Sequence, residues 1–205
     1  MTARSRACAA ATVRRRAAAA ALAGLLLPGG TTQAVITSTL LTLSGNRLTL
    51  RVGSAGGTID NVAFTVSGAN LQPSPSPVTR PDTVTVLLTA DKALLALTVN
   101  TVRLTATPAI GLTCTTSSTC GSTTIPFSTI SWVSTNPDAS GQDIQSGTFN
   151  ATGSQQQIAQ FPLPLLSLLS ARTEMNNALR FSYANSTVYP SGVYTGRVTF
   201  TATMF

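Results

Sequence analysis

The sequence contains no histidine, and charged residues make up only 9% of its 205 residues. Without histidine, a Ser–His nucleophile pair and a histidine-bearing metal site are both excluded. Neither a Gly-x-Ser-x-Gly elbow nor a phosphate-binding glycine loop is present. We therefore predict a protein that is not an enzyme and carries no cofactor. The remaining enzymatic alternative is a hydrolase using two of the six carboxylates, which are Asp60, Asp82, Asp91, Asp138, Asp143 and Glu174.

One stretch begins like a calcium-binding loop. In residues 136–141, Asn136, Asp138 and Ser140 bear oxygen ligands at alternate positions before Gly141. The twelfth position of such a loop would be Gly147 rather than a bidentate glutamate. We interpret the stretch as an Asx-type turn and predict no metal site.

Positive charge is concentrated near the start of the chain. Five of the 13 basic residues precede an apolar run from Ala17 to Leu27, the layout of a secretory signal peptide. The run is shorter than the roughly 20 residues that span a bilayer. Small residues at Thr32-Gln33-Ala34 predict cleavage after Ala34, with an uncleaved anchor as the alternative. We expect residues 1–34 to be the signal peptide and the mature protein to reach the periplasm, the cell surface or the medium.

Removal of residues 1–34 would leave eight basic and six acidic residues. This near balance gives no electrostatic footprint for phosphate, so we predict no nucleic-acid partner. No later apolar stretch is long enough to cross a bilayer, so we expect no integral membrane span after signal cleavage.

Cysteine is scarce, with three residues in the chain. Cys8 lies in the basic N-terminal region and would leave with the signal peptide. Cys114 and Cys120 flank a short Thr/Ser segment, and in an oxidising compartment they are expected to form a disulfide. A bridge over so short a loop contributes about 2 kcal/mol, so it pins a loop rather than holding the fold together.

Apolar residues recur at every second position along much of residues 35–205, the period of a strand with one buried face. Gly, Pro and Asn turns separate these stretches. The pattern predicts an all-β protein, an antiparallel immunoglobulin-like β-sandwich with at most one short helix, at residues 163–169. We predict a single domain over residues 35–205. The alternative is two small sandwiches with a boundary near residues 108–124.

Three tyrosines and one tryptophan could form a platform for stacking against sugars. Trp132 follows Ile130 at period two and is predicted to lie in the core. Tyr189 precedes a Pro-Ser-Gly loop and is the expected exposed aromatic. Tyr189 and Tyr194 are therefore the candidate contacts to a ligand or partner, and a secreted carbohydrate-binding module is an alternative function.

The last strand is predicted to run from Val193 to Phe205, and its apolar and polar residues alternate. Val198, Phe200 and Ala202 are predicted to face the core, while the threonines between them face outward. Gly192 is fourteenth from the end, and Ala202, Phe200 and Val198 are the fourth, sixth and eighth.

In this pattern the chain resembles the pilin and pilin-like subunits of bacterial chaperone–usher systems, including the spore coat protein U-like group. It differs in placing its aromatic residue, Phe205, last instead of next to last. The resemblance implies an exported structural or adhesive subunit of the bacterial envelope that lacks one strand. A neighbouring envelope subunit or a periplasmic chaperone would then fill the gap by β-strand addition. Residues 35–43 could serve as a donor segment, or form an ordinary first strand in a hairpin with residues 48–52.

Overall fold

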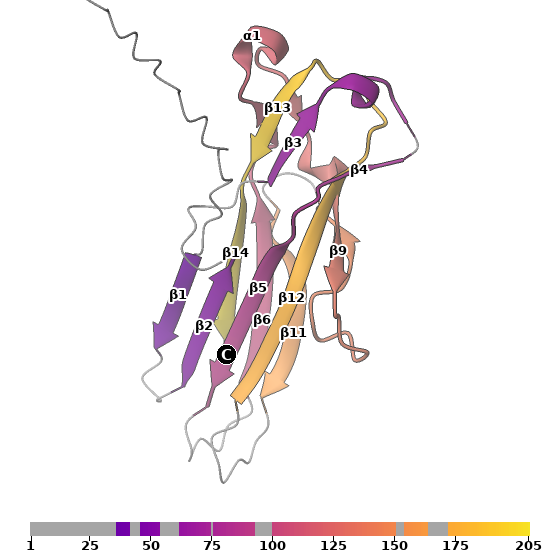
Figure 1. Cartoon of the computed structure of the whole chain (residues 1–205). Helices are drawn as coiled ribbons and strands as arrows, with labels where there is room; N and C mark the ends of the chain where they lie inside the picture. Colours follow the sequence, from indigo (N-terminus) through magenta and orange to yellow (C-terminus); the bar gives the residue numbers. More distant parts are fainter. Residues whose placement is uncertain are drawn as a thin grey trace, which may run out of the picture. The chain divides into compact units, whose positions relative to one another are not determined.

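Antiparallel strands make up most of the chain that the computed structural model describes (Figure 1). The described residues are 36–41, 46–53, 62–74, 76–92, 100–150, 154–163 and 172–205, and all belong to the unit of residues 32–205. The predicted signal peptide lies outside the described residues, and so does the predicted helix apart from Leu163, which ends a strand.

Seven strands form the largest sheet, which we call sheet 1. Its order is β1-β2-β5-β12-β9-β10, with β4 also paired to β12. All of its pairings are antiparallel. The strands are β1 (Ile36–Leu41), β2 (Arg47–Val52), β4 (Val78–Thr79), β5 (Val84–Asp91), β9 (Ile130–Thr135), β10 (Gly147–Thr148) and β12 (Arg172–Tyr183).

Two smaller sheets complete the fold. Sheet 2 has the order β11-β6-β14, and sheet 3 has the order β3-β13-β7-β8. Their strands are β3 (Val62–Val66), β6 (Asn100–Pro108), β7 (Leu112–Cys114), β8 (Thr124–Ile125), β11 (Gln156–Leu163), β13 (Gly192–Gly196) and β14 (Val198–Met204). The described helical turns are η1 (Gly68–Leu71), α1 (Ser117–Cys120) and η2 (Phe127–Thr129).

Alternating residues bury one face of each sheet. In β2, Leu48 and Leu50 are buried while Arg47 and Arg51 are exposed, and β3 buries Val62, Phe64 and Val66 in the same way. Buried residues from all three sheets form one hydrophobic core, which includes Trp132 as predicted. The predicted all-β, antiparallel sandwich-like fold is confirmed.

The terminal residues form two strands rather than the single strand that the sequence predicts from Val193 onward. β13 belongs to sheet 3 and β14 to sheet 2, and the chain passes from one to the other at Arg197. Their partner ribbon, β6 followed by β7, crosses between the sheets at the same level, where the Ala109 N–H donates to the Arg197 carbonyl at 2.9 Å.

A glycine is required at this crossing. A Cβ on Gly196 would lie 2.8 Å from the ring of buried Phe127 and 2.9 Å from the Gly111 carbonyl oxygen. Such contacts are closer than real Cβ atoms make. The absence of a side chain at residue 196 therefore lets the ribbon pass over Phe127 on its way into sheet 2.

Candidate functional site

The outer edge of β14 is the candidate site. β14 pairs with β6 in one unbroken register from Val198↔Pro108 to Met204↔Val102. Among the described strands, β6 is its only partner. β14 therefore has one edge inside sheet 2 and one edge turned away from it.

Backbone hydrogen bonds identify the residues that face this outer edge. Arg197 bonds to Ala109, and Phe205 and Thr101 exchange both N–H···O bonds, at 2.7 and 3.1 Å. Bonded and non-bonded positions alternate along an antiparallel ladder. The odd-numbered residues of β14 therefore point their N–H and C=O groups at β6. The even-numbered ones, Val198, Phe200, Ala202 and Met204, point theirs at the outer edge.

The side chains of β14 follow the same alternation. Val198 is buried, and Phe200 and Ala202 are partly buried and pack against the core. Met204 packs there too, while the three intervening threonines are exposed. The residues with outward backbone groups are therefore also the residues that face the core, and that core is incompletely covered along this edge.

The opposite edge of the same sheet, on β11, is protected. A register shift between Gln157 and Ala159 leaves Ile158 as a bulge, and bulges discourage further pairing. The outward N–H of Gln160 donates to the Gln142 carbonyl at 3.2 Å. Two residues on, Pro162 has no N–H to offer a neighbour. β14 has no bulge and no proline, and its seven residues carry no charge.

The loop that contributes Gln142 is held by its own polar groups. The Ser140 hydroxyl donates to the Asp138 carboxylate, which also accepts the Asp143 N–H at 3.0 Å. The Ser140 hydrogen bond and then the Asp143 N–H lower the pKa of Asp138. Partial burial, followed by the charge of Asp138, raises the pKa of Asp143. These local contacts fit the predicted Asx-type turn, in which Asn136 has a left-handed φ of 57°.

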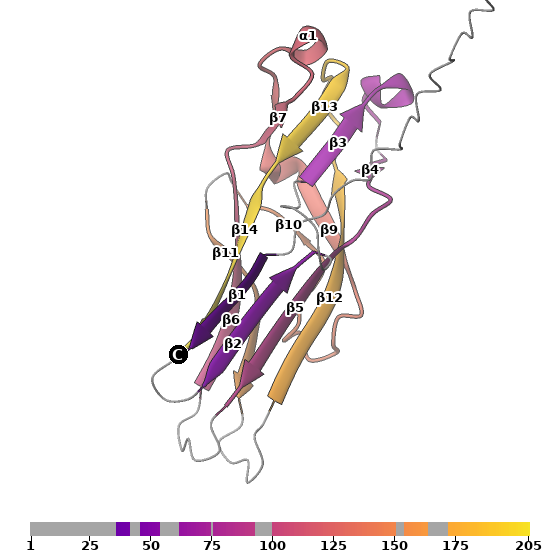
Figure 2. The ribbon, with the colours of Figure 1, turned by 60° about the vertical axis from the view of Figure 1, so that its left-hand side comes forward.

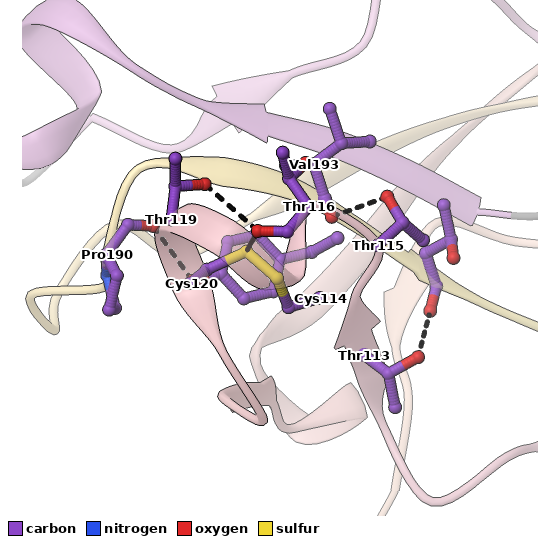
Figure 3. The surroundings of a disulfide bond; sticks show 10 residues. Thr113, Cys114, Thr115, Thr116, Thr119, Cys120, Pro190 and Val193 are labelled. Atoms are coloured by element: carbon purple, nitrogen blue, oxygen red, sulfur yellow. Dashed lines mark hydrogen bonds between the residues drawn. A yellow bond between two sulfur atoms is a disulfide. The ribbon is translucent and has the colours of Figure 1, made fainter.

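The described cysteine pair lies at the other end of the ribbon, beside β13 (Figure 3). Cys114 and Cys120 are joined as predicted, with their Cα atoms 5.9 Å apart. The Thr115 N–H donates to the Val193 carbonyl at 2.7 Å, and the Val193 N–H donates to the Thr116 hydroxyl at 3.1 Å. The stapled loop thus fixes the start of β13.

The contact with the disulfide explains why residue 192 is a glycine. A Cβ there would overlap the Cys120 sulfur and would lie 3.1 Å from the Cys120 Cβ. Gly192 is therefore the residue that lets β13 pack against the disulfide. The contact between Gly192 and Cys120 could not be predicted from the sequence, because the two residues are 72 positions apart.

The expectation of an exposed Tyr189 is wrong. Tyr189 is only 8% exposed, and Tyr194 is fully buried. Their rings meet edge to face, with centroids 6.2 Å apart. The Tyr194 hydroxyl donates to the Pro190 carbonyl at 2.8 Å, and burial raises its pKa. Neither ring offers an open face for a sugar.

A shallow hollow of about 380 Å³ lies over the crossing between sheets 2 and 3. It is bordered by Ile110, which is 83% exposed, and by Arg197. Arg197 is its one charged lining residue, and no carboxylate or tyrosine lines it. The hollow therefore has no acid–base pair for catalysis.

No protein-family model, curated protein or solved structure matches this chain. Within the described ranges, no helix is long and apolar enough to cross a membrane. The same residues contain no group of three or more His, Cys, Asp or Glu side chains that could hold a metal ion. The outer edge of β14 is thus the candidate functional site.

A pair of substitutions tests which side of β14 faces the core. Phe200→Ala should lower the free energy of unfolding by about 2 kcal/mol, less than the 3–5 kcal/mol of a fully buried phenylalanine, because Phe200 is only partly buried. Thr199→Ala should change it by less than about 0.5 kcal/mol. Urea denaturation of both variants measures the difference. Equal losses would show that both faces of β14 are covered.

Proposed function

We propose that this protein is an exported, non-enzymatic structural or adhesive subunit of the bacterial envelope that accepts an extended strand from a partner along β14. The observation that carries the proposal is the contrast between the two edges of sheet 2. The β11 edge has a bulge, a proline and a covering loop, whereas β14 has no bulge, no proline and no covering loop among the described residues. Proteins normally protect exposed edges because unpaired strands invite association. An edge left without protection is therefore a candidate interface.

The position of β14 within the sandwich supports this proposal. In immunoglobulin-like sandwiches, a tyrosine near the start of one strand bonds back to the backbone a few residues upstream, and that strand has a neighbour on each side. Tyr194, in β13, makes such a bond to Pro190, and β14 continues the same ribbon. β14 has β6 on one side and no described strand on the other. A partner strand would pair with β14 on the side opposite β6.

One feature of the sequence and one of the structure support export. The basic and apolar pattern of residues 1–34 is typical of a signal peptide. The Cys114–Cys120 pair, at disulfide distance, suits an oxidising compartment. The partner would accordingly be another envelope subunit or a periplasmic chaperone.

Ala202→Pro should prevent assembly while leaving the subunit folded. The Ala202 N–H points to the outer edge, so proline removes a hydrogen bond to the partner and none to β6. Thr201→Ala is the matched control, because its side chain is exposed and its backbone is unchanged. Light scattering and negative-stain microscopy of the exported proteins should show assemblies for the wild type and the control, and monomers for Ala202→Pro.

Hydrogen exchange supplies a second readout on the same samples. The amides of Phe200, Ala202 and Met204 should exchange fast in the monomer and become protected on assembly, while those of Thr201 and Thr203 are protected in both states. A far-ultraviolet spectrum and a urea transition like those of the wild type would establish that Ala202→Pro is folded. A wild type that stays monomeric and finds no assembly partner, or assembly of folded Ala202→Pro at the wild-type level, would overturn the proposal.

A further inference from the structure

The outward face of sheet 2 has a single charged side chain on β6 and β14. The odd-numbered residues of both strands point away from the core, into which β6 turns Val102 and Leu104. These outward residues are threonines at every position except Arg103. Arg103 is opposite Thr203 on one side and Gln160 of β11 on the other. It therefore lies in the middle strand of a polar face.

An exposed aromatic ring lies beside this arginine. In Figure 2 the end of the chain, marked C, is at the lower end of β14. Phe205 is held there by the two backbone hydrogen bonds that it exchanges with Thr101, which places it diagonally across from Arg103. The Arg103 Cζ lies 4.7 Å from the centre of the Phe205 ring. Phe205 is nevertheless 57% exposed, so most of its surface is open to a ligand.

Most of the hydrogen-bonding capacity of Arg103 is unused. Its Nε–H donates to the Gln160 Oε1 at 3.3 Å, which fixes the orientation of the guanidinium group. Its terminal N–H groups have no partner among the residues that the structure describes. Within the same residues, the one ion pair is Arg80 with Asp82, so no carboxylate neutralises Arg103. The polar face thus holds a positioned, uncompensated cation with free donors.

These groups together match a carboxylated sugar. The planar guanidinium group donates two parallel hydrogen bonds to a carboxylate, and a nearby aromatic ring buries the apolar C–H surface of a sugar. The cation and the ring belong to adjacent strands, about 4.8 Å apart, so one sugar unit reaches both. The Thr203 hydroxyl, beside them on the same face, suits a sugar hydroxyl. A phosphate polymer would require several cations, whereas Arg103 is alone on these strands.

We propose that Arg103 and Phe205 bind a hexuronate, a sugar unit with a carboxylate on its ring, on the outward face of sheet 2. The carboxylate accepts hydrogen bonds from the Arg103 guanidinium group, and the C–H face of the sugar packs against Phe205. This inference goes beyond the proposed function, because the accepted strand pairs with the edge of β14, whereas the sugar binds outward side chains. The ligand of the exported subunit is then an acidic polysaccharide.

Titration calorimetry of the exported protein at low salt tests the proposal. The probes are the trimers of galacturonic acid and of mannuronic acid, with the methyl ester of the galacturonic acid trimer as the uncharged control. Arg103→Gln should weaken binding about tenfold. Arg103→Lys keeps the charge but not the fork, and should weaken it about threefold. Phe205→Ala should also weaken it about threefold. Arg51→Gln removes the same charge from an exposed position on sheet 1 and should stay within about twofold of the wild type.

Three results would overturn the inference: no binding of either trimer to the wild type, equal affinity for the trimer and its ester, or equal weakening by Arg51→Gln and Arg103→Gln. Urea transitions like that of the wild type establish that the variants are folded. Light scattering of the same samples keeps the two proposals apart, because Arg103→Gln should assemble as the wild type does. A protein that assembles but binds neither trimer contradicts this inference alone. One that binds a trimer but has no assembly partner contradicts the proposed function alone.

Discussion

Replacing Gly192 with alanine should lower the free energy of unfolding by about 1–3 kcal/mol, the usual cost of forcing extra atoms into a packed site. The new methyl group would overlap the Cys120 sulfur, which is held in place by the bond to Cys114. The sulfur cannot move freely, because the loop that carries it is tied to Val193 by backbone and threonine hydrogen bonds. The cost must therefore be borne by a shift of β13 or of the loop.

A double-mutant cycle makes this prediction specific to the contact. The variant Cys114→Ala with Cys120→Ala should itself lose about 2 kcal/mol, from the released loop. In that background the sulfur is gone and the 3.1 Å contact with the Cβ of residue 120 remains, so Gly192→Ala should cost about 1 kcal/mol or less. Ser191→Ala, at an exposed neighbouring position, is the control and should be silent. Urea denaturation of the five proteins gives the coupling energy. An equal cost of Gly192→Ala in both backgrounds would show that the glycine is needed for another reason.

The strands were predictable because their signal is local. Leu48, Leu50 and Val52 alternate with polar residues in the sequence, and a sheet with one buried face produces that alternation directly. The hairpin of residues 36–41 with β2 follows from the intervening turn in the same way. The disulfide was predictable for a similar reason, since two cysteines six residues apart have few alternatives.

The break between β13 and β14 was not predictable from periodicity. Tyr194 and Val198 are both buried and are four residues apart, so the period of two continues through Gly196 without interruption. The change of sheet depends on the partner ribbon and on Phe127 beneath Gly196, both distant in sequence. A glycine inside an otherwise regular strand pattern was the available signal, because such glycines often mark a close approach.

The difference between the two edges of sheet 2 also depends on long-range structure. Strand order decides which strands are edges, and nothing local in the sequence of β14 states that it has a single neighbour. One local signal did exist for the other edge. Pro162 lies within the β11 stretch, and proline inside a strand pattern indicates an edge whose N–H side is unpaired. The sequence thus contained evidence that β11 is an edge strand. That β14 is the other edge strand could be seen only from the strand pairing in the structure.

Tyr189 and Tyr194 were predicted to contact a ligand or partner, but in the structure they are buried and stabilise a turn. Tyr189 precedes a Pro-Ser-Gly turn, which suggested exposure, yet the chain turns there so that Tyr189 packs on Tyr194. Tyr194 then bonds back to Pro190 across the same turn. These residues therefore anchor the entry to β13 and do not form a binding platform.

Tyr194→Ala should lower the free energy of unfolding by about 3–5 kcal/mol, because it removes a fully buried aromatic side chain. Tyr194→Phe keeps the ring and loses the hydroxyl with its bond to the Pro190 carbonyl, so it should cost about 1 kcal/mol. The difference between the two variants isolates ring packing from the hydrogen bond. Both are measured by urea denaturation, with Thr199→Ala as the exposed control.

The same variants address the carbohydrate-binding alternative. Because both rings are buried, folded Tyr194→Phe should bind any glycan on an array as the wild type does, and loss of stability should be the main effect of Tyr194→Ala. A Tyr194→Ala protein of wild-type stability that had lost a specific glycan would contradict the anchor role. It would return Tyr194 to a ligand site and would require the turn at Pro190 to open, since only then could a sugar reach the ring.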